Sequence, residues 1–278
     1  MKKILTLTCL LVVSLVFGQN SLLWKIEGKD LSKPSYLFGT VHMICKDNFK
    51  MQDKLVDAIK NTDQAYFEID MGNPNFLMQM QSNMLGEKTI SSQISKEDSI
   101  FIDQKVKNVL GVGLANVDQL KPLIIMSIVM QKSFPCEITS LEDEIIKRFR
   151  QDDKLMGGLS TVKDQYNYLD RFIDAKELVT MIKSIESEEM TSTFNKIYEL
   201  YQNEDIKGLD QEMVKYSSSN SELYEVLMVE RNKIWSDKIP SIIKEKSTLI
   251  AVGSGHLSGE KGLINLLKNQ GYKVTPVF

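Results

Sequence analysis

Both ends of this 278-residue chain alternate short apolar runs with helical repeats, and this alternation constrains the fold most. Strand-like runs occur at 22–26, 35–38, 65–69, 248–252 and 273–277. A helical pattern carried by Leu55, Val56 and Ile59 separates the second run from the third, and another at 263–268 separates the last two. Buried strands that alternate with helices are typical of a mostly parallel sheet with helices on its faces.

The middle of the chain has a different pattern. From Ser95 to about Ile243 it is almost entirely helical, and Ser95-Lys96-Glu97-Asp98 and Ser140-Leu141-Glu142-Asp143 resemble helix-start boxes. One exception, 155–159, could form another strand. We therefore expect an α/β fold whose mostly parallel sheet is built from the N- and C-terminal segments, with a large helical insertion at roughly 95–243. No linker rich in Pro, Gly or Ser divides residues 19–278, which favours a single domain.

Residues 1–18 have the features of a secretory signal: a charged start, an apolar run over 4–17 and an exit at Gly18. The apolar run is too short to remain as a membrane-spanning helix, and no later segment approaches such a length. Cys9 raises a lipid anchor as a competing interpretation, but it lies inside the apolar run, well before a plausible cleavage point. We expect a periplasmic or secreted protein.

The charge balance is mildly acidic, with 34 basic and 37 acidic residues. No basic block is present, which argues against nucleic acid or anionic lipid as a partner. After export two cysteines remain, Cys45 and Cys136, in a compartment where disulfides persist. A bridge between them would hold the segment after His42 to the middle of the chain. The alternative is two unpaired thiols.

The chain has only two histidines, His42 and His256, and each closes a Gly-x-x-His frame just after a strand-like run. Imidazole is well suited to proton transfer or metal binding at neutral pH. Ligands of open α/β sheets bind at the carboxyl ends of the strands, so neighbouring strands would direct both rings into one crevice. Either frame alone is short and common, and would indicate only a turn histidine bonded to a backbone carbonyl. The repetition favours a shared site.

Three further polar residues are candidates for this site. Glu68 ends an apolar strand, where an unpaired carboxylate would be costly to bury, so we expect it to face the crevice as a metal ligand or base. Its alternative is a salt bridge to a buried Arg or Lys. Arg231 and Asn232 lie on a helix before the last strands, where a guanidinium could stabilise an oxyanion. A solvated helix face is equally compatible with their flanking charges.

Other familiar motifs are absent or ambiguous. The glycines of 253–259 are spaced one residue too widely for a dinucleotide loop, and too little chain follows for the complete unit. No serine nucleophile elbow and no His-Glu-x-x-His motif occur. An apolar stripe at helical spacing predicts core packing, with a methionine-lined lid over the crevice as the alternative. The stripe comprises Phe76, Leu77, Met80 and Met84.

Taken together, these motifs resemble the TraB/GumN family, which includes the TIKI proteases that clip Wnt proteins. Leu23-Trp24-Lys25-Ile26 and Tyr36-Leu37-Phe38-Gly39-Thr40-Val41-His42 are similar to the family's opening. Val252-Gly253-Ser254-Gly255-His256-Leu257 and Gly271-Tyr272-Lys273-Val274 are similar to its end. The resemblance implies an α/β fold shared with erythromycin-esterase-like and ChaN-like proteins and, in the TIKI branch, a divalent-metal-dependent peptidase.

The same resemblance assigns roles to residues. It implies His42 and His256 as the motif histidines, Glu68 as the acid on the following strand, and Arg231-Asn232 as the Arg-Asn pair. It also matches Ser140-x-Glu142 to a bacterial Ser-x-Glu. One departure stands out. Where bacterial members read Gly-Leu-Glu-Thr, with a Gln shortly after, this chain reads Gly158-Leu159-Ser160-Thr161 with Gln165 retained. A serine at a ligand or base position would weaken metal binding or catalysis.

The sequence leads to three functional hypotheses. The first is an exported metal-dependent hydrolase, a metalloprotease acting on a peptide or protein. His42, His256 and Glu68 would hold a divalent ion such as Mn, Co or Zn, Glu68 or Glu142 would accept a proton, and Arg231 would stabilise the oxyanion. The second is a non-catalytic protein that binds a peptide or signal, a decayed enzyme. The third is a metal-free, esterase-like hydrolase with a histidine base.

Overall fold

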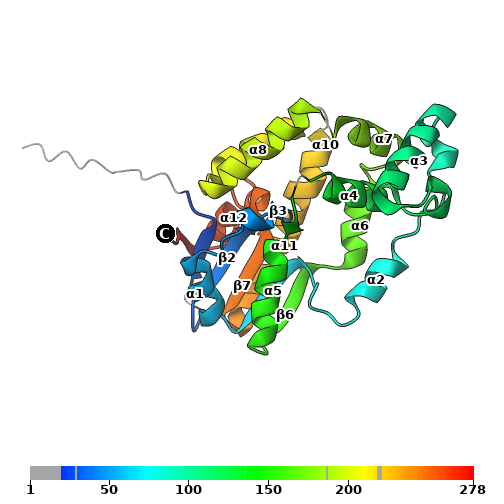
Figure 1. Cartoon of the computed structure of the whole chain (residues 1–278). Coiled ribbons are helices and arrows are strands. Elements are labelled where there is room, and N and C mark those ends of the chain that lie inside the picture. The colour runs from blue at the N-terminus through cyan, green and yellow to red at the C-terminus, as the bar shows by residue number, and fades with distance from the viewer. Residues whose placement is uncertain (1–19, 29, 135, 186, 218–220) are drawn as a thin grey trace, which may run out of the picture.

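A six-stranded sheet forms the centre of the protein in a computed structural model that describes residues 20–28, 30–134, 136–185, 187–217 and 221–278 (Figure 1). The predicted signal segment at 1–18 lies outside the described residues. The strand order is β6-β4-β7-β2-β1-β8. The strands are β1 (Leu23–Glu27), β2 (Ser35–Thr40), β4 (Gln64–Ile69), β6 (Leu155–Ser160), β7 (Thr248–Gly253) and β8 (Lys273–Pro276).

Most neighbouring strands of this sheet run parallel. β2 pairs with β7, β7 with β4 and β4 with β6 in parallel, whereas β1 pairs antiparallel with both β2 and β8. The prediction of a mostly parallel sheet is therefore confirmed. The N- and C-terminal segments provide five strands, and the edge strand β6 comes from the exception at 155–159 within the helical middle.

Helices cover both faces of the sheet. In Figure 1, α1 (Asp53–Asn61) and α5 (Leu141–Gln151) lie in front of it, and α11 (Arg231–Glu245) and α12 (Leu263–Asn269) lie behind. Apolar side chains from strands and helices form one continuous core in between, because strands covered on both faces must bury both sets of side chains. Its largest fully buried members are Trp24, Trp235, Phe67 and Phe149.

The middle of the chain forms a helical part with a second hydrophobic core around Ile102, Val106, Ile125 and Leu178. Its helices are α2 (Phe76–Ser82), α3 (Lys96–Leu110), α4 (Pro122–Ser133), α6 (Val162–Asp170), α7 (Ala175–Ser184), α8 (Glu188–Gln202), α9 (Ile206–Tyr216) and α10 (Ser221–Tyr224). Both predicted helix-start boxes form a cap, since the Ser95 hydroxyl accepts from the Asp98 N–H and the Ser140 hydroxyl from the Asp143 N–H. The central helical insertion is thus confirmed.

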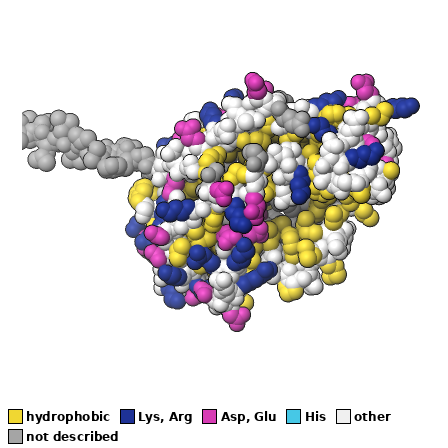
Figure 2. Space-filling model, viewed as in Figure 1, with side chains coloured by type: hydrophobic (Ala, Val, Ile, Leu, Met, Phe, Trp, Pro, Cys, Tyr) yellow, Lys and Arg dark blue, Asp and Glu magenta, His cyan; other side chains and the backbone are white. Residues whose placement is uncertain are grey.

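The surface of the helical part carries apolar side chains. Of the predicted stripe on α2, Phe76, Met80 and Met84 pack against the second core, whereas Leu77 is 73% exposed. Figure 2 shows hydrophobic side chains gathered near α2, while charges of both signs mix over α1 and α5, the helices in front of the sheet. Within the described residues, no helix combines the length and apolar character needed to cross a bilayer.

A small two-stranded sheet lies beside the main one. It pairs β3 (Ile44–Cys45) with β5 (Ile138–Thr139), and a disulfide joins Cys45 to Cys136 with their Cα atoms 5.6 Å apart. The predicted bridge is confirmed. It ties the segment that follows His42 to the segment that leads into α5.

Candidate functional site

Two sharp turns bring the histidine frames together. β2 and β7 are adjacent and parallel, with Thr40 paired to Gly253, so both chains leave the sheet at the same edge. The turn after β7 packs directly on β2, because a Cβ on Gly39 would lie 2.7 Å from a methyl group of Leu257. The backbone of Ser254 would also lie only 3.1 Å from that Cβ, so a larger residue here would force the turn to shift. The predicted adjacency of the two frames is therefore observed.

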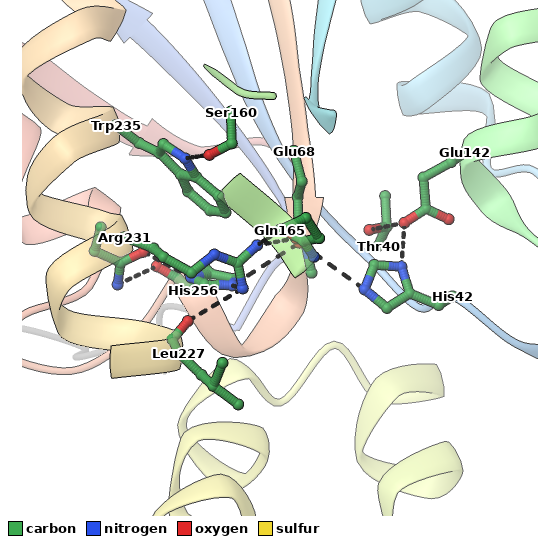
Figure 3. Close-up of polar contacts among 12 residues, drawn as sticks. Thr40, His42, Glu68, Glu142, Ser160, Gln165, Leu227, Arg231, Trp235 and His256 are labelled. Carbon is green, nitrogen blue, oxygen red and sulfur yellow. Dashed lines mark hydrogen bonds and ion pairs between the residues drawn. The ribbon is translucent and has the colours of Figure 1, made fainter. Parts of the chain in front are cut away.

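His42 and His256 face one carboxylate (Figure 3). Nε2 of His42 lies 3.9 Å and Nε2 of His256 lies 3.8 Å from Oε1 of Glu68. Glu68 belongs to β4, the neighbour of β7 on the side away from β2. Three adjacent strands thus each place one group at the carboxyl edge of the sheet, as expected for ligand sites of open α/β folds.

The other nitrogen of each imidazole has a fixed partner. Nδ1 of His42 lies 2.7 Å from Oε1 of Glu142, which also accepts a hydrogen bond from the Thr40 hydroxyl. Nδ1 of His256 lies 2.7 Å from Oδ1 of Asn232. Because a carboxylate or amide oxygen accepts from an Nδ1–H, these contacts leave Nε2 of both rings as the atom that faces Glu68. Glu142 and Asn232 therefore orient the histidines from behind.

Glu68 forms a buried ion pair with Arg231. The guanidinium NH2 contacts Oε2 of Glu68 and donates to Oε1 of Gln165 at 3.0 Å, while the Gly253 N–H donates to Oε1 of Glu68 at 2.9 Å. Both partners are buried, with side-chain exposures of 6% for Arg231 and 9% for Glu68. Glu68 thus faces the two histidines and also forms a salt bridge with a buried arginine. The two alternatives predicted for Glu68, a place in the crevice and a buried salt bridge, are therefore both observed. The solvated helix face proposed for Arg231 and Asn232 is wrong, because α11 buries both.

Trp235 supports the site from α11. The Arg231 guanidinium lies over its ring at 4.5 Å, and the His256 ring lies 4.6 Å from it. The indole N–H donates to the Ser160 hydroxyl at 2.8 Å. Ser160, where the resemblance leads us to expect a glutamate, is the last residue of β6 and reaches the site through Trp235 (Figure 3).

Electrostatics differ sharply between the two rings. Partial desolvation lowers the pKa of His42, but the hydrogen bond and charge of Glu142 and the charge of Glu68 outweigh this effect and raise the pKa to about 9. Its side chain is nonetheless 63% exposed, so solvent can reach the ring. Burial lowers the pKa of His256 to about 3, which leaves this ring neutral. Burial alone would raise the pKa of Glu68, yet the nearby charges, Arg231 foremost, hold it well below its usual value.

Three of these atoms suit a divalent ion by type: Nε2 of His42, Nε2 of His256 and Oε1 of Glu68. Imidazole and carboxylate ligate Zn and other transition metals, and the contacts at Nδ1 are those that metal-binding histidines make. The atoms border one small space, since a Cβ on Gly253 would lie 3.2 Å from Oε1 of Glu68 and 3.7 Å from Nε2 of His42. In the described part of the chain no group of three or more His, Cys, Asp or Glu is spaced to hold an ion as it stands. Binding would require the donors to move closer.

The structure gathers all six predicted site residues, and it adds three that the sequence did not single out for the site. These are Thr40, which donates to Glu142, Trp235, and the backbone N–H of Gly253. Thr40 precedes His42 by two residues and could have been inferred from strand alternation. Trp235 lies one helical turn after Arg231, a spacing that places both on one face of α11. A π-helical segment, Glu225–Glu230, leads directly into Arg231, and such segments are frequent at functional sites.

The fold and these contacts define an α/β protein with a His-Glu-Arg centre at the carboxyl edge of a mostly parallel sheet. A model of the TraB/PrgY/gumN family matches residues 22–276, and the chain belongs to that family. Neither the curated proteins nor the solved structures give a match to this chain.

Proposed function

We propose that the protein is an exported, divalent-metal-dependent hydrolase that cleaves peptide bonds. The observation that carries this proposal is the convergence of two oriented imidazole nitrogens on one oxygen of Glu68. Membership in the TraB/PrgY/gumN family supports it. The signal features of residues 1–18 support the periplasm or the extracellular space as its location.

The chain's own residues would hold the ion in a defined way. His42, His256 and Glu68 would supply the ligands, Glu142 and Asn232 would fix the two rings, and a bound divalent ion would polarise the scissile carbonyl and activate water. His256 is neutral and has no proton to lose, although its Nε2 lies 3.4 Å from NH1 of Arg231, whereas His42 must first lose a proton. Ligation and deprotonation are therefore linked at His42.

Glu68 and Glu142 are the two carboxylates of the site that could accept a proton. Both oxygens of Glu68 are engaged, one by Arg231 and the other by the Gly253 N–H. Oε1 of Glu142 accepts from Thr40, but its buried Oε2 has no hydrogen-bond partner among the described residues. Because Glu142 lies behind His42, on the side of the ring away from Glu68, the choice of proton acceptor between Glu68 and Glu142 stays a prediction.

The main role proposed for Arg231 is to hold the carboxylate of Glu68. Its NH2 group donates to Glu68 and Gln165, and its NH1 group donates to the Leu227 carbonyl at 3.2 Å. A guanidinium with these fixed partners keeps the carboxylate ionised and correctly turned. Its predicted contact with a developing oxyanion stays a prediction.

Metal content and peptide hydrolysis test the proposal together. The purified mature chain, loaded in turn with Zn, Mn and Co and then desalted, is expected to retain about one equivalent of metal and to hydrolyse a peptide pool. His42→Ala should lose both, while Lys46→Ala, an exposed residue four positions later, should keep both. A mature chain that retains no metal under any loading condition would exclude the metal role.

One observation favours metal-free hydrolysis as a second candidate. Arg231 already neutralises Glu68, and its NH1 lies 3.4 Å from Nε2 of His256, so positive charge is present without an ion. His42, oriented by Glu142, would then serve as base once it has lost its own proton, as histidine does in hydrolytic triads, so this activity should increase as the pH rises towards about 9. Activity that survives exhaustive chelation would point to this candidate.

The contact of Ser160 with Trp235 favours a third candidate, a peptide-binding protein without turnover. Ser160 supplies a hydroxyl where the resemblance leads us to expect a carboxylate, and this hydroxyl is already engaged by the indole. Ser160→Glu separates the cases. A gain of peptide hydrolysis indicates a decayed enzyme, whereas unchanged tight peptide binding without turnover indicates a binding protein.

A further inference from the structure

We propose that a cavity next to His42 is the specificity pocket of this site and that it binds one large apolar side chain, aromatic or branched aliphatic, of a peptide substrate. This inference rests on the proposed peptide hydrolysis and adds the class of residue that the protein selects. The cavity has a volume of about 360 Å³. That size lies at the small end of ligand pockets.

Two parts of the fold form the walls of the cavity. The segment after β2 contributes His42 and Met43, and the small sheet contributes Cys45. The helical part supplies the opposite wall: Met130 and Phe134 at the end of α4, and Phe194 and Tyr198 on α8. The cavity thus lies between the sheet edge that carries the histidines and the helices of the insertion.

The lining is apolar and almost free of charge. Of the described residues that line it, His42 alone has a side chain that ionises near neutral pH. Aliphatic, aromatic and sulfur-containing side chains supply most of the rest, and Ser133, Thr191 and Asn195 add neutral polar groups. A cationic side chain placed here would be desolvated without a carboxylate partner among the described lining residues, and an acidic one would meet only His42, whose charge Glu142 and Glu68 already balance. An apolar side chain gains free energy by leaving water.

His42 connects the cavity to the reacting centre. The same side chain lines the cavity, is 63% exposed and places Nε2 3.9 Å from Oε1 of Glu68. A substrate side chain seated in the cavity would therefore hold its own backbone close to Glu68 and His256. An extended peptide can place a side chain in the cavity and its scissile bond near Glu68 at the same time, because only the Cα atom separates a side chain from the adjacent peptide bond.

The walls are held firmly for a surface cavity. The Cys45–Cys136 disulfide joins the His42 side of the cavity to the end of the α4 segment. On the opposite wall the Phe134 and Phe194 rings lie 5.4 Å apart, and the Tyr201 hydroxyl donates to the Gly39 carbonyl at 2.9 Å. Because the cavity is already formed, little conformational entropy is lost when a substrate side chain binds. This favours its use in selecting the substrate.

Paired substitutions on α8 test the pocket. Thr191 lines the cavity and its neighbour Ser192 does not, and both are exposed. Thr191→Trp should fill the cavity, Ser192→Trp is the matched control, and Phe194→Ala should enlarge the cavity. Each variant is assayed with labelled peptide pools that fix one position as Phe, Leu, Ala, Asp or Lys, by cleavage-site mass spectrometry and by fluorescence anisotropy at equilibrium.

The expected result is a preference for Phe or Leu over Ala, Asp and Lys beside the scissile bond, by at least about tenfold in kcat/KM. Thr191→Trp should remove this preference and weaken binding of the Phe pool, Ser192→Trp should retain both, and Phe194→Ala should shift selection towards larger residues. Anisotropy reports on the pocket even if no peptide is cut, so failure of the hydrolysis proposal remains distinguishable. Equal binding of all pools, or equal effects of Thr191→Trp and Ser192→Trp, would overturn the pocket.

Discussion

Glu142 contacts His42 with a carboxylate oxygen 2.7 Å from Nδ1, on the side of the ring opposite Glu68. The two residues are 100 positions apart, and they meet because α5 begins at the same sheet edge where β2 ends. A histidine held between two carboxylates favours its protonated form in the absence of a metal. This arrangement determines how the site responds to substitution and to pH.

Removing the charge of Glu142 should lower the pKa of His42 towards the usual histidine value. In Glu142→Gln the amide oxygen can still accept from Nδ1, so the ring keeps its orientation and loses only the charge that favours protonation. NMR titration of the metal-free protein measures this directly, since only two imidazoles contribute. Metal affinity should fall by about 10- to 100-fold. Glu137→Gln, on an exposed residue paired with Lys46, is the control, and an unchanged His42 pKa would contradict the expectation.

Metal affinity should rise with pH up to about 9. Because Glu142 and Glu68 raise the pKa of His42 to about 9, an ion must displace a proton from this ring at neutral pH. His256, whose pKa is about 3, has no proton to lose there. The apparent affinity should thus grow roughly tenfold per pH unit below pH 9 and then level off. Calorimetry in buffers of different ionisation enthalpy should detect one released proton near pH 7, and binding without proton release would contradict the assignment.

Removing one partner of the Arg231–Glu68 ion pair should lower the free energy of unfolding. Arg231→Met leaves the Glu68 carboxylate buried without its cation, and such changes cost about 3–5 kcal/mol of unfolding free energy. Adding Glu68→Gln should recover part of this loss, because no charge then remains unpaired. Arg171→Met breaks the exposed pair with Glu222 and should cost less than about 1 kcal/mol. Urea denaturation measures all four chains, and equal losses for the buried and exposed pairs would contradict the expected difference.

The disulfide should stabilise both the fold and the loop that carries His42. It joins positions 91 residues apart, and bridges that close long loops contribute about 2–5 kcal/mol. The variant Cys45→Ala with Cys136→Ala should unfold at lower urea concentration, and its metal affinity should fall because His42 lies three residues from Cys45. Comparison with the reduced wild-type chain separates loss of the bridge from the effect of the substitutions. Identical unfolding curves for the bridged and unbridged proteins would contradict this role.

The sequence predicted those features of the protein that depend on neighbouring residues in the chain. The two Gly-x-x-His frames predicted a shared site because each follows a strand, and Ser95 and Ser140 predicted helix starts through their caps. The position of Glu142 behind His42 depends on how α5 packs against the end of β2, a tertiary contact without a local signal. The link from Ser160 to Trp235 likewise required the register of β6 against β4. The sequence around Arg231 could not show whether its side chain is buried or exposed, because the polar residues on both sides are equally compatible with a solvated helix face.

The place of β7 in the sheet has a consequence for how the protein is made. β2 and β4 are synthesised early, yet neither pairs with the other, and both pair with β7, which begins at Thr248. A growing or truncated chain that lacks this segment exposes two unpaired strand edges, which are prone to association with other chains. The same segment leads into His256. A chain cut short before Thr248 therefore lacks both one of the two histidines and the strand that joins β4 to β2 in the sheet.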